Sequence, residues 1–382
     1  MGMLVILLDG AAEPKRSAYK QAKTPFLDKI ASKSMCGLWE GPVAPDGYNV
    51  KSLSEIGMME IFGYSPAESP GRGFMEALAL GVKPRHNAVY FRANFATVDD
   101  SLSITDRRAG RDESGLDEIS KSLSAEIEGI KFTFAKGKGH RGVVVLEGRV
   151  SKEVTDVDTG ESKPQNVKPK SEEAEMTSIA LNKYLEWSHS VMSRHPANSK
   201  RKVPANYLLL RSPGMMKPIE PFRERFCLEA CAVGNDTIFN GMAKYLGMKV
   251  IATGEEKEIE GNIEEKLSTA LGELENNSIV FLHIKGADTY SHNKDFSGKS
   301  GFIEELDMTV FSTLFKKSVK FSVISDHATD SETGEHCLSR IPFLVYNGKD
   351  SNNIKRFNEE DCKEGFFATS PIETIIELAG IA

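Results

Sequence analysis

The sequence is poor in cysteine, in histidine and in long hydrophobic runs. Its 382 residues include only five cysteines and eight histidines. The cysteines form neither a CxxC pair nor a disulfide framework, so we expect a reduced, cytoplasmic environment. The opening "MGMLVILLDG" is too short for a signal peptide, and no run approaches the length of a membrane span. Basic residues are outnumbered, 48 against 55, and the net charge of −7 argues against broad binding to nucleic acid or to anionic membranes.

Four apolar runs have the pattern of strands in a buried sheet. They span residues 3–8, 278–284, 319–325 and 341–347. The first lacks any apolar–polar alternation, as expected of a strand covered on both faces, and the others resemble it. Helical segments lie between the runs, and one of them has Asp236 or Thr237 as its expected N-cap. Strands that alternate with helices predict a doubly wound α/β fold, in which ligands bind beyond the carboxyl ends of the strands.

The middle of the chain has a different pattern. Alternating segments such as "NAVYFRANFATV" and "RGVVVLEGRV" are separated by polar turns, which is typical of α+β structure. A stretch rich in Lys, Ser and Pro at residues 160–173 is expected to be a long loop. The first strand precedes this region and its sheet partners follow it, so we interpret the middle as an inserted domain. We place it at residues 76–217, which leaves residues 1–75 and 218–382 for the sheet domain.

Acidic and imidazole side chains follow three of the apolar runs. They are Asp9 after the first run, Asp288 and His292 after the second, and Asp326, His327 and His336 after the third. Carboxylates mixed with imidazoles suit Zn²⁺, Mn²⁺ or Co²⁺, whereas Ca²⁺ prefers oxygen ligands alone. A single Asp-His pair is more often a surface pair than a metal site, but three clusters at one topological position favour metal. Six such groups predict two divalent ions, the usual clamp for phosphoryl or other ester transfer.

Ser54 is the candidate nucleophile for such a transfer. It precedes the predicted helix "EIGMMEIFG", where the positive end of the helix dipole favours an alkoxide and an incoming phosphate. The simpler alternative is that Ser54 only caps the helix, with Glu55 in the first turn. Next to a metal cluster, however, one serine could serve both as a ligand and as the nucleophile.

The inserted region supplies cationic groups. Arginine grips carboxylate and phosphate with two parallel hydrogen bonds. Arginines this close together are also common on solvated surfaces, and the residues alone leave both interpretations open. The candidates are Arg107, Arg108 and Arg111 in "TDRRAGR", His140 and Arg141 in "GHRG", and Arg211 in "LLLRSPG".

At this point the chain resembles the archaeal-type cofactor-independent phosphoglycerate mutases, which are members of the alkaline phosphatase superfamily. The resemblance covers nearly the whole chain. It rests on "KTPFLDKIA", "SEIGMMEIFGYSP", "GRGFMEALALGV", "YFRANFATVDD", "TDRRAGR", "NYLLLRSPG", "HIKGADTYSH" and "SDHATDSETGEH". It implies an alkaline-phosphatase-like sheet domain with an inserted phosphotransferase domain. It also implies interconversion of 3- and 2-phosphoglycerate in glycolysis and gluconeogenesis, through a phosphoserine and without 2,3-bisphosphoglycerate.

The resemblance also assigns roles to individual residues. One metal would be held by Asp9, Ser54, Asp326 and His327, and the other by Asp288, His292 and His336. The residues that would face the substrate are Arg107, Arg108, Arg111, His140, Arg141, Asp156 and Arg211. Protons must also pass between the two glycerate hydroxyls, and Asp156 or His140 is our candidate for this task. The pair Ser54-Glu55, where this branch is expected to have Ser-Asp, resembles the larger cofactor-independent mutases. The Ala-Ala-Glu that follows Asp9-Gly10 is a second departure.

Three alternatives remain at this stage. A metal-dependent phosphomonoesterase or sulfatase-like hydrolase would use the same metals and nucleophile but water as the acceptor. A phosphopentomutase-like enzyme is a closer rival, and a metal-dependent binding protein without turnover is a more distant one. Mn²⁺ is the expected ion, the ligand set also tolerates Mg²⁺, Co²⁺ or Zn²⁺, and the sequence leaves the oligomeric state open.

Overall fold

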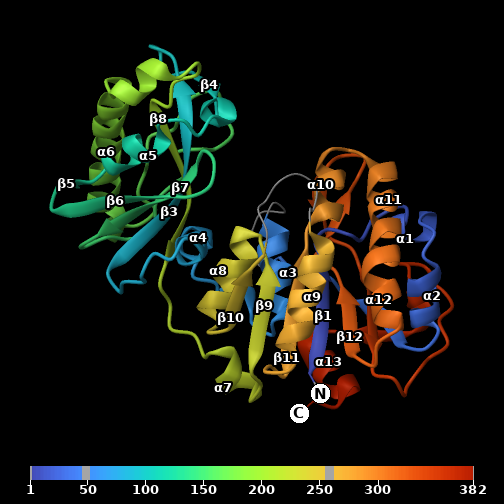
Figure 1. Cartoon of the computed structure of the whole chain (residues 1–382). Coiled ribbons are helices and arrows are strands. Elements are labelled where there is room, and N and C mark those ends of the chain that lie inside the picture. Colours follow the sequence, from blue (N-terminus) through green and yellow to red (C-terminus); the bar gives the residue numbers. More distant parts are fainter. Residues whose placement is uncertain (1, 45–51, 254–261, 382) are drawn as a thin grey trace. The chain divides into compact units, whose positions relative to one another are not determined.

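The computed structural model describes residues 2–44, 52–253 and 262–381 of the chain. It divides into two compact units (Figure 1). The large unit contains Met1–Glu68 and Ile219–Ala382, and the small unit contains Ser69–Pro218. None of the helices in these described ranges is long and apolar enough to cross a membrane.

Eight described strands form the sheet of the large unit. In order across the sheet they are β10 (Lys249–Ala252), β9 (Ala230–Gly234), β11 (Ile279–Ile284), β1 (Met3–Leu8), β12 (Lys320–Ile324), β15 (Ile341–Tyr346), β2 (Met35–Trp39) and β16 (Phe366–Ala368). Neighbours run parallel except at β15, which is antiparallel to both β12 and β2. The four predicted apolar runs are confirmed as β1, β11, β12 and β15.

Helices cover both faces of this sheet. They are α1 (Ala18–Gln21), α2 (Pro25–Ala31), α3 (Leu53–Ile61), α7 (Phe222–Phe226), α8 (Thr237–Tyr245), α9 (Ile263–Glu273), α10 (Gly286–His292), α11 (Phe296–Leu306), α12 (Ser312–Phe315) and α13 (Pro371–Ala379). A short π-helical segment, Asp307–Phe311, connects α11 to α12. The predicted doubly wound fold class is therefore confirmed. Asp236 is the N-cap of α8, because its carboxylate accepts hydrogen bonds from two backbone amides of the first turn.

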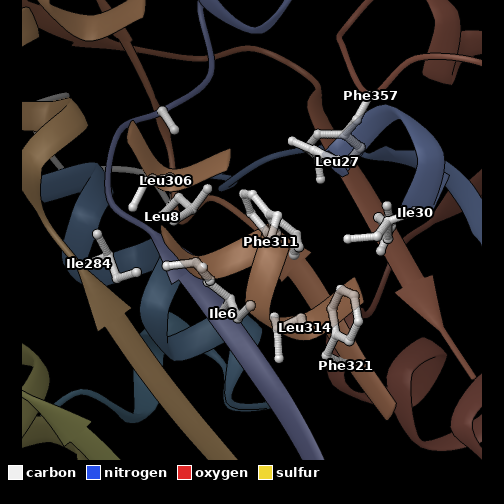
Figure 2. Packing of buried hydrophobic residues seen from close by; sticks show 14 of the residues in the cluster. Ile6, Leu8, Leu27, Ile30, Ile284, Leu306, Phe311, Leu314, Phe321 and Phe357 are labelled. Atoms are coloured by element: carbon white, nitrogen blue, oxygen red, sulfur yellow. The ribbon is translucent and has the colours of Figure 1, made fainter. Parts of the chain in front are cut away.

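Alternate residues of β1 send their side chains to opposite faces of the sheet. Ile6 and Leu8 lie in one apolar cluster with Leu306 and Phe311 (Figure 2). On the other face, the ring of Phe281 in β11 meets the ring of Phe62 edge-on at 4.8 Å. Each fully buried side chain of this kind contributes about 1.5–3 kcal/mol. Packing on both faces of the sheet holds β11, β1 and β12 in place, and the carboxyl ends of these strands carry the candidate site.

The small unit is built on an antiparallel sheet. Its strands are β4 (Ile104–Asp106), β3 (Ala88–Val98), β7 (Arg141–Glu147), β6 (Ile130–Lys136) and β5 (Ala125–Ile127) in that order, and β8 (Tyr207–Met215) also pairs with β3. Its helices are α4 (Arg72–Ala79), α5 (Leu116–Lys121) and α6 (Glu175–Ser193). This is the α+β unit that the sequence pattern predicts. The expected loop is free of helix and strand until a 3₁₀ turn begins at Glu172.

The boundary between the units lies between Glu68 and Ser69, not between residues 75 and 76 as the sequence suggests. The reason is α4, which packs on the sheet of the small unit. The ring of Phe74 meets that of Tyr90 edge-on at 5.1 Å. Gly73 lies so close to β3 that a Cβ atom there would stand 2.1 Å from the Tyr90 carbonyl oxygen. Helix α4 therefore belongs to the inserted unit.

Candidate active site

Three adjacent parallel strands bring the predicted ligands of the large unit to one edge of the sheet. Asp9 follows β1 directly, and Asp326 and His327 follow β12. Helix α10 begins just after β11 and carries Asp288 in its first turn. Because β11, β1 and β12 are parallel neighbours, their carboxyl ends meet at the same edge, as expected for a ligand site in such a sheet.

Asp9, Asp326 and His327 form the first ligand group. Their ligand atoms all lie within 4.8 Å of one another. His327 Nε2 is 3.1 Å from Asp9 Oδ1 and 3.6 Å from Asp326 Oδ2, and all three side chains are buried. Gly10 supports the group, because its amide donates to Asp326 Oδ1 at 3.1 Å. Gly10 has a φ of +58°, and a Cβ there would lie 2.6 Å from the Thr329 hydroxyl, so the chain requires glycine at this turn.

The second ligand group consists of Asp288, His327 and His336, with His292 beside it. The ligand atoms of the first three again lie within 4.8 Å of one another. His292 Nε2 is 3.3 Å from Asp288 Oδ2 and 3.2 Å from His336 Nε2. His336 is held by the hairpin of β13 (Ala328–Asp330) and β14 (Glu335–Cys337), where it pairs with Thr329. The sequence separates His327 from this group, whereas the structure places its ring 4.0 Å from that of His336, between the two groups.

The hydrogen bonds of two histidines direct their Nε2 atoms toward the carboxylates. His292 Nδ1 lies 2.8 Å from the Gly334 carbonyl oxygen, and His327 Nδ1 lies 3.2 Å from that of Ala328. A carbonyl oxygen can only accept, so in each ring Nδ1 donates. The neutral ring then presents the lone pair of Nε2, as is usual for metal-binding histidines whose other ring nitrogen donates to a carbonyl oxygen. Asp9 Oδ2 and His336 Nδ1 are also buried without a hydrogen-bond partner among the described residues. This donor set fits divalent ions.

Ser54 contacts the first ligand group. Its hydroxyl donates to Asp326 Oδ2 at 2.9 Å. The helix begins one residue before it, at Leu53, and the N-cap position belongs to Ser52. Ser54 therefore lies within the first turn of α3, which corrects our expectation that it precedes the helix, and the alternative that it is the N-cap is wrong as well. One turn later, Gly57 allows the helix to approach so closely that a Cβ would stand 1.8 Å from the Asp326 carbonyl oxygen.

The electrostatics of the large-unit site indicate an excess of buried negative charge. Burial and the nearby Asp9 raise the pKa of Asp326 to about 6. Burial lowers the pKa of His327, but Asp326 and Asp9 outweigh it and raise this pKa to about 9. For Asp9, the raising effect of burial is overcome by neighbouring cations, chiefly Lys285, and its pKa is lowered. Buried carboxylates that draw in protons in this way are suited to a bound cation.

Sequence reasoning missed two cationic or titratable neighbours of Asp9. Lys285 Nζ lies 3.6 Å from Asp9 Oδ2 and 2.7 Å from Asp236 Oδ2. His283 is fully buried, with Nε2 3.4 Å from Asp9 Oδ2 and its ring stacked on Phe239. The signal for Lys285 was available, since it follows a strand directly. His283 lies inside an apolar run, where a histidine cannot be told from a core residue.

Cross-strand pairing in the small unit gathers three arginines on one face of the sheet, which we call the arginine face. Arg92 of β3 lies opposite Arg211 of β8, and Asn94 lies opposite Arg141 of β7. Directly opposed residues share a face, and so do residues two apart on one strand. The alternate residues of β3, such as Phe91, lie in the core with α6 on the other face. Arg92, Arg141 and Arg211 therefore point to the same side.

Arg92 is the residue of this face that sequence reasoning missed. It is largely buried, and its Nε lies 3.3 Å from Glu76 Oε1. The same oxygen is 3.1 Å from Arg72 Nε, so the Glu76 carboxylate pairs both with Arg72 of α4 and with Arg92 of β3. Burial lowers the pKa of Arg92 to about 9, although Glu76 raises it. A buried surplus of guanidinium groups is suited to an anionic ligand.

Two other predicted residues of the small unit, Arg107 and Asp156, are connected to β8, the strand that carries Arg211. A third, His140, directly precedes Arg141. Arg107 binds the carboxylate of Asp158, and Arg211 Nη1 is 3.9 Å from the same side chain. Asp156 accepts the Ser212 amide at 2.8 Å, and burial raises its pKa. Burial and nearby arginines, chiefly Arg141, lower the pKa of His140 to about 4.

Arg108 and Arg111 also repel the His140 imidazolium, so both lie within electrostatic reach of it. Their turn is unusual, because Ala109, Gly110 and Arg111 all have positive φ. Left-handed conformations of this kind cost free energy and are concentrated at functional sites. The candidate residues thus form two sets: the ligand groups with Ser54 in the large unit, and the arginine face with His140 in the small unit.

Comparison with known proteins identifies the chain. The family model "2,3-bisphosphoglycerate-independent phosphoglycerate mutase" matches residues 31–198. A mutase of that name from Methanocaldococcus jannaschii is 34% identical over 387 residues, which cover 95% of this chain and 92% of the relative. One from Pyrobaculum islandicum is 33% identical, with coverage of 94% and 92%. A cofactor-independent phosphoglycerate mutase structure from Thermoplasma acidophilum covers 100% of both chains at 26% identity and a TM-score of 0.69.

The chain has a doubly wound sheet with carboxylate and imidazole groups at its carboxyl edge, and an arginine-bearing unit is inserted into the sequence of that sheet domain. These features are those of an enzyme of the phosphoryl-transferring class. Within that class, the chain belongs to the family of 2,3-bisphosphoglycerate-independent phosphoglycerate mutases. The family expected from the sequence motifs is confirmed.

Proposed function

We propose that this chain interconverts 3-phosphoglycerate and 2-phosphoglycerate through a phosphoserine at Ser54, without 2,3-bisphosphoglycerate. The observation that carries the proposal is the hydrogen bond of 2.9 Å between Ser54 Oγ and Asp326 Oδ2. It puts a primary hydroxyl, in the first turn of a helix, against the first ligand group. Family membership supports the same reaction.

Two divalent ions complete the proposed site. Asp9, Ser54, Asp326 and His327 would hold one ion, and Asp288, His292 and His336 the other. His327 lies close enough to both groups to influence each. Mixed carboxylate and imidazole ligands suit Mn²⁺, which is our expected ion, and Mg²⁺, Co²⁺ or Zn²⁺ would also be accepted. When bound, such ions neutralise phosphate charge and favour the ionised form of a serine hydroxyl.

The residues of the large unit perform the first transfer. Ser54 gives up its hydroxyl proton and its Oγ attacks the phosphorus in line, while the bond between phosphorus and the glycerate oxygen breaks and that oxygen takes up a proton. The ammonium group of Lys285, held between Asp236 and Asp9, offers a fixed positive charge at the edge where charge develops. In the second transfer, the other hydroxyl of the glycerate loses its proton and attacks the phosphoserine, which restores Ser54.

The arginine face of the small unit would retain the glycerate between the two transfers. Arg92, Arg141 and Arg211 suit its carboxylate, and Arg107, Arg108 and Arg111 lie in the turn close by. Protons must be exchanged between the two glycerate hydroxyls, and His140 or Asp156 is our candidate for this task. His140 starts from the neutral form, because the surrounding arginines and burial lower its pKa to about 4. A bound anion would offset these positive charges and increase its basicity.

The cell compartment follows from the same proposal. Phosphoglycerates are intermediates of glycolysis and gluconeogenesis, so the enzyme would act in the cytoplasm. The five cysteines, all within the described part of the chain, form no disulfide, which suits a reducing compartment.

An enolase-coupled assay on 3-phosphoglycerate tests the proposal. With Mn²⁺ present, turnover should be the same with and without added 2,3-bisphosphoglycerate, and the Ser54→Ala variant should lose it by orders of magnitude. Steady release of inorganic phosphate as the main product would instead indicate a phosphomonoesterase. Absence of turnover without 2,3-bisphosphoglycerate would overturn the proposal.

A further inference from the structure

A lysine of α11 is completely buried beneath the ligand groups. Lys299 has no exposed surface. Its Nζ lies 2.9 Å from Glu13 Oε1 and donates to the carbonyl oxygens of Ala12 and Thr329, each at 3.2 Å. Glu13 is itself only 4% exposed. Lysine and glutamate are almost never fully buried unless they are paired, so this ion pair calls for an explanation.

The partners of Lys299 belong to the two loops that carry the first ligand group. Ala12 and Glu13 follow Asp9 in the loop after β1, and Thr329 follows His327 in the loop after β12, which includes the short strand β13. The two loops also meet directly, because the Thr329 amide donates to the Ala12 carbonyl at 3.1 Å. Lys299 therefore joins these loops at the point where their ligands converge.

Thr329 transmits this contact to both ligand groups. Its hydroxyl donates to Asp288 Oδ1 at 3.1 Å and lies 3.1 Å from His327 Nδ1. His327 Nδ1 is a donor, as its contact with a carbonyl requires, so the hydroxyl can accept from the imidazole while it donates to the carboxylate. A shift of the Thr329 backbone would therefore change the orientation of both His327 and Asp288.

Glu13 extends the connection to α10, the third segment that carries ligands. Ser331 donates a hydrogen bond to Glu13, and the Ser331 and Ser291 hydroxyls lie 3.4 Å apart. Ser291 lies in α10 between Asp288 and His292. The Glu13 amide donates in turn to Glu359 Oε1 at 3.0 Å, which fixes the loop from its other side. A single buried pair thus contacts or reaches every segment that supplies a ligand after β1, β11 and β12.

Stability alone does not account for such a pair. Desolvation of two buried charges offsets much of their attraction, and apolar or neutral replacements of similar shape are often no less stable. We infer that Lys299 and Glu13 form a positioning pair that holds the loops after β1 and β12 in the geometry that divalent ions require. The inference rests on the proposed function only in treating the two groups as metal ligands.

The test measures Mn²⁺ binding to the metal-free full chain by titration calorimetry. The double variant Lys299→Met/Glu13→Gln removes both charges together and keeps side chains of similar length, so neither member of the pair is left as a buried charge without its partner. Loss of outer partners of metal ligands typically weakens metal binding by about 10–100-fold, and we expect a loss in this range. Activity should return as Mn²⁺ is raised to saturation, because the ligands and Ser54 are unchanged.

Asp307→Asn is the matched control. Asp307 is also fully buried, and it accepts hydrogen bonds from the amides of Phe26 and Leu27 at the start of α2. It contacts neither ligand-bearing loop in these bonds, so its replacement should lower thermal stability and leave Mn²⁺ affinity unchanged. Wild-type Mn²⁺ affinity in the double variant, or an equal loss in the control, would overturn the inference. A wild-type chain that binds Mn²⁺ but shows no mutase turnover would refute the proposed function and leave the positioning pair standing.

Discussion

Replacing Gly57 with alanine should separate Ser54 from Asp326. The added Cβ would lie 1.8 Å from the Asp326 carbonyl oxygen, whereas Cβ atoms essentially never come closer than 3.0 Å to a neighbour. The obstacle is backbone, so α3 must move by about 1.2 Å or more, and Ser54 on the first turn moves with it. Misplacement of a reacting group by about 1 Å can cost about 100-fold in rate, and overpacking costs about 1–3 kcal/mol in stability. We expect kcat to fall by about 100-fold while the chain still folds.

The assay for this prediction is mutase turnover at saturating Mn²⁺, with circular dichroism to confirm the fold. Gly272→Ala is the matched control, because Gly272 is also a helical glycine of the large unit and a Cβ there would meet nothing within 4 Å. Alanine is favoured over glycine in helices by about 1 kcal/mol, so this variant should be fully active and slightly stabilised. Wild-type kcat in folded Gly57→Ala would refute the close packing of α3 on Asp326 as a requirement for catalysis.

Three further predictions concern the ligands, the arginine face and pH. His336→Ala should lower the Mn²⁺ content of dialysed protein in metal analysis without unfolding it, and unchanged content would count against the second ligand group. Arg92→Met should raise KM for 3-phosphoglycerate by about 10–100-fold, which corresponds to the loss of one charge-assisted hydrogen bond. Hydrolysis of an aryl phosphate should be unaffected, and equal losses in both assays would indicate a role in folding only. Because the pKa of His140 is lowered from 6.5 to about 4, the unfolded chain takes up this proton first as the pH falls, so stability should decline between about pH 6.5 and pH 4. Thermal melts of His140→Gln should show a shallower decline, and parallel curves would contradict the shift.

The part of the site in the large unit could be predicted because two simple rules coincide there. Largely apolar runs identified β1, β11 and β12, and the carboxyl ends of parallel strands share an edge. Polar residues after those runs therefore had to lie near one another. The direction of β15 could not be predicted in this way, since an apolar run gives no sign of whether a strand runs parallel or antiparallel to its neighbours.

Other features depend on contacts that a sequence pattern does not contain. An arginine in an alternating strand suggests a solvated side chain, and only the pairing of Arg92 with Arg211 and Glu76 shows otherwise. Lys299 and Glu13 are 286 positions apart, and each alone would be expected at the surface. The start of α3 was misplaced because two serines, Ser52 and Ser54, compete there for the N-cap, and helix ends are hard to fix from sequence alone.

In the proposed mechanism, Ser54 carries the phosphoryl group during turnover. This role is tested most directly by mixing the Mn²⁺-loaded chain with 3-phosphoglycerate labelled in its phosphate, quenching within a single turnover, and mapping the labelled peptide by mass spectrometry. We expect label on Ser54 in the wild-type chain and none in Ser54→Ala. Label on a different residue, or turnover in Ser54→Ala without any phosphorylated residue, would contradict it.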